Sequence, residues 1–382
     1  MADDLLRTCS PEDAGFDRRR WNSALTLASG LAERETGCLA LEVARGGRTM
    51  GPAHFGRQDS RDPTPLRKDA IFLVASLTKP VVAMGAMLLV ERGLLSLTEK
   101  VADFFPRSDS SRRLLTVRHL LTHTSGLPDM LPDNLDLRRR QAPLSAFLEG
   151  ACQVPLDFPP GRGVQYQSMG FMLLARIIEL VAGRSLPDFL RTEIFEPCGM
   201  FDTALGAPPE WFDGAEPTIR RVPRIDVPEE QRGGDDWNWN SRYWLTLGAP
   251  WGGLLSTPTD LLRFCRVMLL GTAGQATPEL PFAPATVRAS IVNQIESYPD
   301  VPEADRRCRG WGFGWRLQWP THAASYGDLV GPEAFGHWGA TGTLFWCDLR
   351  ADLAAVLLTS VPLDRSGRAL ARLSSAIAAA GQ

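Results

Sequence analysis

Two segments at opposite ends of the chain constrain the fold most, because each alternates apolar and polar residues as paired strands do. The first, GCLALEVARGGRTMGPAHFG at 37–56, is interrupted by RGGR at 45–48, and the second, at 339–361, is interrupted by RAD at 350–352. Such short turns between alternating runs are typical of β-hairpins. Since a single hairpin is marginal in water, we expect both pairs of strands to share one antiparallel sheet.

The stretch between these two segments has helical character. Residues 80–91 and 169–181 are largely apolar runs of helical length, followed by Gly93 and Gly183, which are typical helix stops. An Ala-rich run at 369–380 predicts a closing helix. We therefore predict an α/β (α+β) fold, in which helices flank an antiparallel sheet built from the N- and C-terminal segments and a mainly helical domain is inserted.

The domain boundaries follow from the same pattern. We assign residues 1–75 and 296–382 to a discontinuous sheet domain and residues 76–295 to the helical domain, with the active site at their interface. A chain of 382 residues that is 44% hydrophobic can bury a core of this size.

Charge and composition exclude several classes of function. The net charge of -3 and the pI near 6.0 give no basic field for nucleic acid or an anionic membrane. No run of 18 apolar residues occurs, and the N-terminal stretch lacks the pattern of a signal peptide, so we expect a cytoplasmic protein. Seven scattered cysteines without a C-x-x-C pair predict reduced thiols rather than disulfides or a zinc ribbon.

One lysine stands out in FLVASLTKPVVAMGAMLLVERG at 72–93. The chain has 41 Lys plus Arg, yet only Lys68, Lys79 and Lys100 are lysines. An arginine guanidinium cannot exchange a proton at ordinary pH, whereas an amine with a lowered pKa can. With Pro80 in the first turn of its helix, Ser76 and Lys79 lie three residues apart on one face. The pair predicts a serine activated by an amine, although a chance Ser-x-x-Lys pair is the plain alternative.

Two further elements are ambiguous when taken alone. Tyr166 and Ser168 precede the helix at 169–181, which suggests a second base, but taken alone the pattern is more simply explained by a packed tyrosine with Ser168 as a helix cap. The stretch FGHWGATGTLFWCDL at 335–349 has glycines at 336, 339 and 342 that permit close approach along an edge strand.

Taken together and in this order, these elements resemble the serine β-lactamase and penicillin-recognising superfamily. The closest patterns are the class C β-lactamase-like serine hydrolases and the family VIII carboxylesterases. The resemblance extends over most of the chain and rests on these stretches: SPEDAGFD, SLTK, LTVRHLLTHTSGLPD (115–129), YQS, FEPCGMFDT (195–203), APWGGLLSTPTDLLRF (249–264) and GHWGATGT (336–343).

The resemblance implies a role for each matching residue. Ser76 is then the acylated nucleophile, Lys79 its proton partner, and Tyr166 the base that passes the proton to the leaving group. Ser168 occupies the position where the family has Asn or Ser and is expected to contact substrate. The backbone N–H groups of Ser76 and Ala340 are expected to form the oxyanion hole.

Three residues matching the family's Lys-Thr-Gly element bear on the substrate. His337, Trp338 and Gly339 occupy these positions, and we expect them to contact substrate. A neutral histidine cannot pair with the carboxylate of a β-lactam, and Trp338 replaces a small hydroxyl residue with bulk. Both departures, and the lack of a signal peptide, favour an esterase over a β-lactamase.

Residues 233–253 contain four tryptophans, at 237, 239, 244 and 251. We hypothesise that Trp239 and Trp251 form a wall that selects an apolar part of the substrate, with burial of Trp244 and Trp251 in the core as the alternative. His119 and His123 have the spacing of a metal pair but lack the intervening acid of H-E-x-x-H, so we interpret them as structural. The sequence implies no metal and no cofactor.

The function predicted is that of a serine hydrolase that cleaves a small ester through an acyl-enzyme. Acyl transfer to an amine or alcohol by the same intermediate is one alternative, and an amidase, D-peptidase or weak β-lactamase is another. The third alternative function is that of a binding protein on an inactive hydrolase scaffold. The expected partner is a small-molecule ester or amide, and the sequence leaves the oligomeric state open.

Overall fold

A sheet of eight strands joins the two ends of the chain, and this confirms the predicted fold class. The computed structural model describes residues 5–105, 112–319, 322 and 325–381. The strand order is β1-β3-β2-β11-β10-β9-β8, with β4 paired to β2. The strands are β1 (Arg7–Thr8), β2 (Cys38–Arg45), β3 (Arg48–Thr49), β4 (Ala53–Gly56), β8 (Arg316–Leu317), β9 (Phe335–Gly339), β10 (Thr343–Asp348) and β11 (Leu353–Thr359).

The N- and C-terminal hairpins meet where β2 pairs with β11 in antiparallel register, with Leu41 opposite Leu357. Between β2 and β3 the predicted turn is present, since Arg45 pairs with Arg48. Gly46 and Gly47 both have positive φ, 57° and 74°, as a two-residue turn of this twist requires. The sheet is therefore one continuous unit built from residues more than 300 positions apart.

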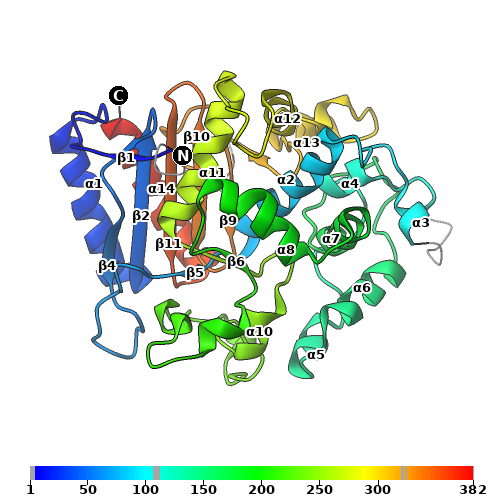
Figure 1. Ribbon diagram of the computed structural model, residues 1–382, viewed down its shortest axis with the longest axis horizontal. Coiled ribbons are helices and arrows are strands. Elements are labelled where there is room, and N and C mark those ends of the chain that lie inside the picture. The colour runs from blue at the N-terminus through cyan, green and yellow to red at the C-terminus, as the bar shows by residue number, and fades with distance from the viewer. Residues whose placement is uncertain (1–4, 106–111, 320–321, 323–324, 382) are drawn as a thin grey trace.

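Helices cover both faces of the sheet. On one face, α1 (Arg18–Leu31) and α14 (Leu363–Ala380) pack with the apolar side chains of alternate strand residues. On the other face lies α11 (Pro258–Ala273), which lies in front of the strands in Figure 1. The closing helix α14 begins at Leu363, six residues before the predicted start at 369. The apolar run did not include its first turns, because their charged residues lie on the partly exposed side of the helix.

The remaining helices gather mainly at the end of the molecule opposite to α1 (Figure 1). The central one, α2, is buried on nearly all sides, which explains its continuous apolar run. These helices are α2 (Thr78–Glu91), α3 (Val101–Phe104), α4 (Val117–Leu121), α5 (Asn134–Arg139), α6 (Leu144–Gln153), α7 (Met169–Ala182), α8 (Leu186–Leu190), α9 (Glu196–Cys198), α10 (Arg242–Leu247), α12 (Pro284–Ser290) and α13 (Glu303–Cys308).

A second, three-stranded sheet links the helical part to the residues before α2. Its strands are β5 (Phe72–Leu73), β6 (Ala204–Leu205) and β7 (Leu254–Ser256), in the order β5-β7-β6. The division of the chain into residues 1–75 with 296–382 and residues 76–295 stays a prediction. Helix α11 falls inside the second range by sequence and packs on the large sheet.

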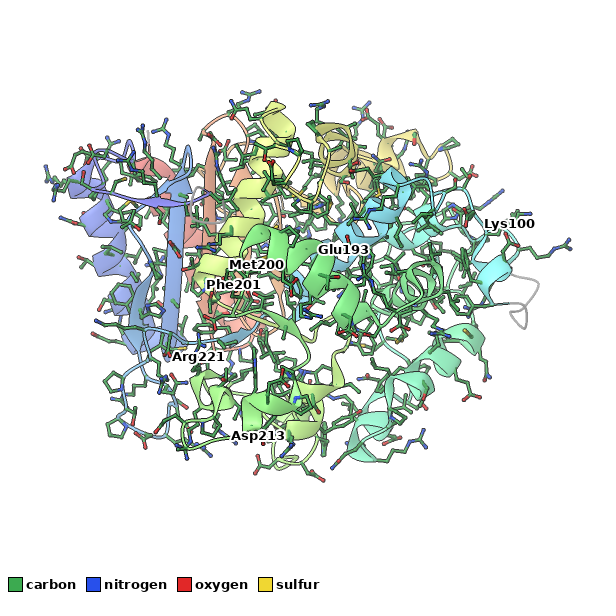
Figure 2. The ribbon with its side chains drawn as sticks, in the orientation of Figure 1. Lys100, Glu193, Met200, Phe201, Asp213 and Arg221 are labelled. Carbon is green, nitrogen blue, oxygen red and sulfur yellow. The ribbon has the colours of Figure 1, made fainter. Side chains whose placement is uncertain are left out.

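Several features bear on the predicted chemistry. All seven cysteines are free, and four of them are buried. Lys68 and Lys100 are exposed, and Lys100 projects from the rim of the molecule beside α3 in Figure 2, whereas Lys79 is fully buried. Among the described residues, no helix has the length and apolar character needed to cross a membrane.

Candidate active site

Ser76 lies in a tight turn between β5 and α2. A short 3-10 helix, Ala75–Leu77, carries the serine, and Ala75 has a φ of 47°, a conformation that non-glycine residues rarely adopt. The turn is held by β7, because the N–H of Val74 donates to the carbonyl of Leu254 at 2.9 Å. Ser76 itself is half-buried. The sharp turn therefore places a half-buried serine at the beginning of a buried helix.

Lys79 is one turn further along and approaches this hydroxyl. Its Nζ lies 3.0 Å from Oγ of Ser76 and donates to the main-chain carbonyl of Trp251 at 3.0 Å. Burial lowers the pKa of Lys79 to about 7, against the opposing effect of the Asp129 carboxylate. A substantial fraction of an amine with this pKa is neutral and can accept a proton near pH 7, unlike an ordinary lysine.

Tyr166 comes from the loop before α7, and its ring lies over the same amine. The ring centroid is 4.6 Å from Nζ of Lys79. Burial raises the pKa of the Tyr166 phenol, and Asp129 adds to this, whereas a hydrogen bond with the Ser76 side chain lowers it without cancelling the rise. The phenol therefore stays protonated near neutral pH, as a proton donor must.

His337 approaches the cluster from β9. Its Nδ1 donates to the carbonyl of Trp338 at 2.7 Å, so Nε2 is the unprotonated nitrogen. Burial, with a smaller contribution from the neighbouring Lys79, lowers the pKa of His337 to about 3. The ring centroids of His337 and Tyr166 are 5.9 Å apart. The side chain at this position is therefore neutral across the physiological range.

Gly339 lets the end of β9 pack directly on the residues before Ser76. A Cβ at this position would lie 2.4 Å from the carbonyl oxygen of Val74 and 2.0 Å from Oγ1 of Thr343. Two hydroxyls bind the same segment: Thr341 donates to the carbonyl of Leu73 at 2.6 Å, and Thr343 donates to that of Val74 at 2.8 Å.

Ala340 follows Gly339 and is exposed at the tip of this hairpin. The contacts of its neighbours tie the hairpin to the segment that leads into Ser76. The oxyanion hole formed by the N–H groups of Ser76 and Ala340 stays a prediction.

Ser168 is buried and bonded to Asp129 rather than open to the cluster. Its hydroxyl donates to Oδ1 of Asp129 at 2.6 Å, and its N–H donates to the carbonyl of the same residue at 3.1 Å. The serine also precedes the first residue of α7, at the cap position. It thus joins the Tyr166 loop to the segment that carries Asp129.

The three predicted tryptophans occupy different places. Trp251 binds Lys79 through its carbonyl, while its ring is buried 5.4 Å from that of Phe147. Trp239 is partly buried, and within the described residues no hydrogen bond or ring contact joins it to Ser76, Lys79 or Tyr166.

Trp338 points away from His337, because successive residues of a strand face opposite sides of the sheet. It packs in the core beneath α1 and α14, with its ring stacked 6.4 Å from that of Tyr326. The structure therefore brings His337 to the Ser76 cluster and does not bring Trp338.

Three residues of the cluster were not predicted as site residues. Trp311 is buried, with its ring centroid 5.9 Å from those of both Tyr166 and His337. His123 lies 4.9 Å from the Tyr166 ring, and Asp129 bonds Ser168. His123 and Asp129 belong to the 115–129 stretch, whose resemblance to the family was the available signal. Nothing in the sequence distinguished Trp311.

His119 and His123 do not act as a pair. Nδ1 of His119 accepts from the N–H of Thr116 at 3.1 Å at the start of α4, and its ring packs on Tyr298. The part of the chain that the structure describes contains no group of three or more His, Cys, Asp or Glu placed to hold a metal ion.

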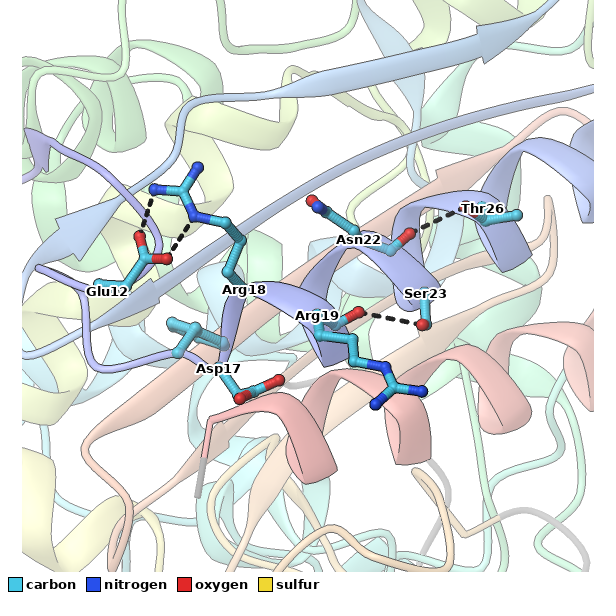
Figure 3. A pocket seen from close by; sticks show the side chains of 8 residues that line it. Glu12, Asp17, Arg18, Arg19, Asn22, Ser23 and Thr26 are labelled. Atoms are coloured by element: carbon cyan, nitrogen blue, oxygen red, sulfur yellow. Dashed lines mark hydrogen bonds and ion pairs between the residues drawn. The ribbon is translucent and has the colours of Figure 1, made fainter.

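A hollow beside the start of α1 is unrelated to this cluster (Figure 3). Its polar lining comes entirely from residues 12–26 and includes an ion pair between Arg18 and Glu12. It contains no nucleophile next to a base and none of the predicted site residues.

Comparisons with known proteins bear on the family and the fold. The family model described as Beta-lactamase matches residues 25–379. Esterase EstB from Burkholderia gladioli is 31% identical over 365 residues, which cover 87% of this chain and 88% of that protein.

Solved structures share the fold. EstCE1, described as a hydrolase with promiscuous acyltransferase activity, superposes with a TM-score of 0.73 at 19% identity, covering 94% of this chain and 99% of that one. The D-amino acid amidase of Ochrobactrum anthropi SV3 gives 0.71 at 21% identity, covering 94% and 98%.

Proposed function

The chain belongs to the beta-lactamase family of serine hydrolases, and from that premise we propose that it cleaves small uncharged esters through an acyl-enzyme on Ser76. The observation that supports this most is the buried amine of Lys79, 3.0 Å from the serine hydroxyl and with its pKa lowered to about 7. A serine hydroxyl is a weak nucleophile until a neighbouring base accepts its proton. The similarity to an esterase over most of both chains supports an ester as the substrate.

The acylation step uses three side chains. Neutral Lys79 takes the proton of Ser76 as Oγ bonds to the ester carbonyl carbon, and the carbonyl oxygen becomes an oxyanion that the N–H groups of Ser76 and Ala340 stabilise. The oxyanion then collapses, the bond to the leaving alcohol breaks, and the Tyr166 phenol donates a proton to that oxygen. Lys79 returns its proton to Tyr166, which restores both groups.

Deacylation repeats these transfers with water in place of the serine. Water adds to the acyl carbon and gives a proton to Lys79. The bond between the acyl carbon and Oγ of Ser76 then breaks, and Oγ receives a proton. The acid is released and the starting protonation states are recovered. The raised pKa of Tyr166 and the lowered pKa of Lys79 suit opposite roles, donor and acceptor, at one pH.

The neutral His337 supports an uncharged substrate. A permanent cation at this position would attract a carboxylate, but the pKa of His337 is lowered to about 3 by burial. A buried carboxylate beside a neutral imidazole would have no counter-charge from this residue. We therefore place esters ahead of β-lactams. We also propose a cytoplasmic location, which the seven free thiols favour.

The test is the intact mass of the protein after brief exposure to p-nitrophenyl esters of several acyl chain lengths, with nitrophenol release followed in parallel. We expect wild type to gain one acyl mass and Ser76→Ala to gain none. Nitrophenol release at equal rates from both proteins would overturn the role of Ser76.

Matched anilides and an added amine acceptor separate the alternatives within the same experiment. Faster cleavage of the anilide than of the ester would move the assignment to an amidase. An acylated amine formed in preference to free acid would move it to an acyltransferase.

A further inference from the structure

One residue holds the backbone on both sides of Tyr166. The N–H of Gln165 donates to the carbonyl of His123 at 2.9 Å, and the N–H of Gln167 donates to Nδ1 of the same histidine at 3.2 Å. Tyr166 lies between these two donors in the chain. Its ring also packs against the imidazole, with centroids 4.9 Å apart. The position of the tyrosine therefore depends on the carbonyl and the side chain of a residue that is 43 positions away in sequence.

The hydrogen bond to Gln167 determines the state of this imidazole. A nitrogen that accepts a backbone N–H cannot itself carry a proton, so neutral His123 carries its proton on Nε2. The ring is fully buried, and Nε2 has no hydrogen-bond partner among the described residues. Protonation of Nδ1 would set one N–H against another and break the contact with the Tyr166 loop.

The surroundings of His123 favour this neutral state. Burial lowers its pKa well below the ordinary value, and the facing Lys79 and His337 lower it further. Its ring makes an edge contact with the ring of Trp311, with centroids 4.2 Å apart. The backbone φ of His123 is 58°, which His and Asn adopt more readily than most residues.

We propose that His123 is a positioning residue for the reaction: its carbonyl and its Nδ1 fix the Tyr166 backbone so that the phenol meets Ser76 and Lys79. This inference rests on the proposed function, because it assigns His123 to the proton transfer that Tyr166 performs. It predicts an effect on kcat rather than on KM, since His123 acts on the catalytic tyrosine and not on the substrate. A displacement of a reacting group by about 1 Å can reduce a rate about 100-fold.

Two substitutions isolate the Nδ1 contact. His123→Asn places an amide oxygen where Nδ1 was, and His123→Gly removes the acceptor, while both residues tolerate a positive φ. We expect kcat for an alkyl ester, whose leaving group needs the proton of Tyr166, to fall no more than about fivefold in the Asn variant and about 100-fold in the Gly variant. KM should stay within about threefold in both.

His119→Ala is the matched control. Its Nδ1 also accepts a backbone N–H, that of Thr116 at 3.1 Å, and it lies on the same segment as His123. Its ring packs on Tyr298 instead of Tyr166. We expect this variant to lose thermal stability through its lost cap and to keep kcat within about threefold of wild type.

The proposal is overturned if folded His123→Gly keeps kcat within about threefold of wild type, or if the Asn and Gly variants lose equal activity. If the Gly variant does not fold, His123→Gln replaces it, because its longer side chain cannot place an oxygen at the Nδ1 position. Equal kcat for the Asn and Gln variants then overturns the proposal.

A measurement that needs no turnover separates this proposal from the proposed function. The 15N chemical shifts of the His123 ring should show the neutral form with its proton on Nε2 throughout pH 6 to 8. A proton on Nδ1, or a charged ring in this range, overturns the positioning role even in an active enzyme. Conversely, wild type that neither turns over esters nor forms an adduct contradicts the proposed function and leaves the tautomer result intact.

Discussion

Lys79 and Asp260 are both buried in the first turn of a helix, α2 and α11, and burial drives both toward the neutral form. The pKa of Lys79 is lowered to about 7 and that of Asp260 is raised to about 6. Oδ2 of Asp260 accepts from the N–H of Asp202 and the hydroxyl of Thr203, both at 2.8 Å. Lys79 instead meets the half-exposed hydroxyl of Ser76.

The difference shows that a shifted pKa does not by itself mark a reaction centre. The partners of Asp260 tie the segment after α9 to α11, in the region that Met200, Phe201 and Arg221 mark in Figure 2. The partner of Lys79 is the hydroxyl of Ser76, a residue that is only half-buried. Perturbed ionisable groups are common in structural networks too, so the partner decides which interpretation applies. The predictions below test that distinction, beginning with the largest effect.

Lys79→Arg should abolish most of the activity. The guanidinium keeps the positive charge but cannot accept the proton of Ser76, so we expect kcat/KM for a p-nitrophenyl ester to fall about 1000-fold or more. Steady-state kinetics with a thermal unfolding control would measure this. A folded Arg variant within tenfold of wild type would show that charge, and not proton transfer, is what the site needs from Lys79.

Tyr166→Phe should cost about 100-fold in kcat with alkyl esters and distinctly less with nitrophenyl esters. The reason is that an alkoxide needs a proton as it leaves, whereas nitrophenolate leaves without one. Comparing both leaving groups for wild type and variant gives the answer. An equal loss with both would contradict a donor role for the phenol.

Lys79→Met should stabilise the folded protein while removing activity. The folded pKa of about 7 lies below the ordinary value of 10.5, so between these pH values the unfolded state binds the proton that the folded state lacks. The free energy of unfolding of wild type therefore rises with pH in this window, and the stability advantage of the Met variant narrows by about 1.4 kcal/mol per pH unit. Urea unfolding at several pH values would test this, and an advantage independent of pH would contradict it.

Asp260→Asn should have the smallest effect on activity, within about twofold, because its partners are structural. For stability the sign is opposite to that of Lys79. With a folded pKa of about 6 against an ordinary 3.8, the folded state binds the extra proton between these values, so this group destabilises the protein as pH rises through them. The stability of the Asn variant relative to wild type should therefore increase as the pH rises to about 6. A large loss of kcat would place Asp260 in the reaction.

The architecture was predictable from sequence because strand alternation and turn residues are local signals. A common sheet for the N- and C-terminal strands followed because each hairpin alone is unstable, and the structure joins the two where β2 pairs with β11. The proximity of Ser76 and Lys79 was likewise readable, since residues three apart at a helix start share a face. The opposite orientations of His337 and Trp338 could also have been expected from alternation along one strand.

Other parts of the site left no such signal. Trp251 contributes a main-chain carbonyl to Lys79, and a carbonyl carries no sequence signature. Trp311 reaches Tyr166 and His337 only through the tertiary packing of distant segments. The contact of His123 with Gln167 is equally long-range, and its i, i+4 relation to His119 suggested a pairing that the fold does not use.

The most direct test of the account is the pH dependence of acylation. Single-turnover release of nitrophenol isolates this step from deacylation. The release is followed at the wavelength at which nitrophenol and nitrophenolate absorb equally, so that the signal does not depend on pH. Lys79 is expected to titrate near pH 7, whereas the pKa of His337 is about 3 and that of Tyr166 is raised, so neither should contribute between pH 5 and 9. The account predicts a rate that rises with pH through a single midpoint near 7. A rate that is flat over this range, or a midpoint near that of an ordinary lysine, would contradict it.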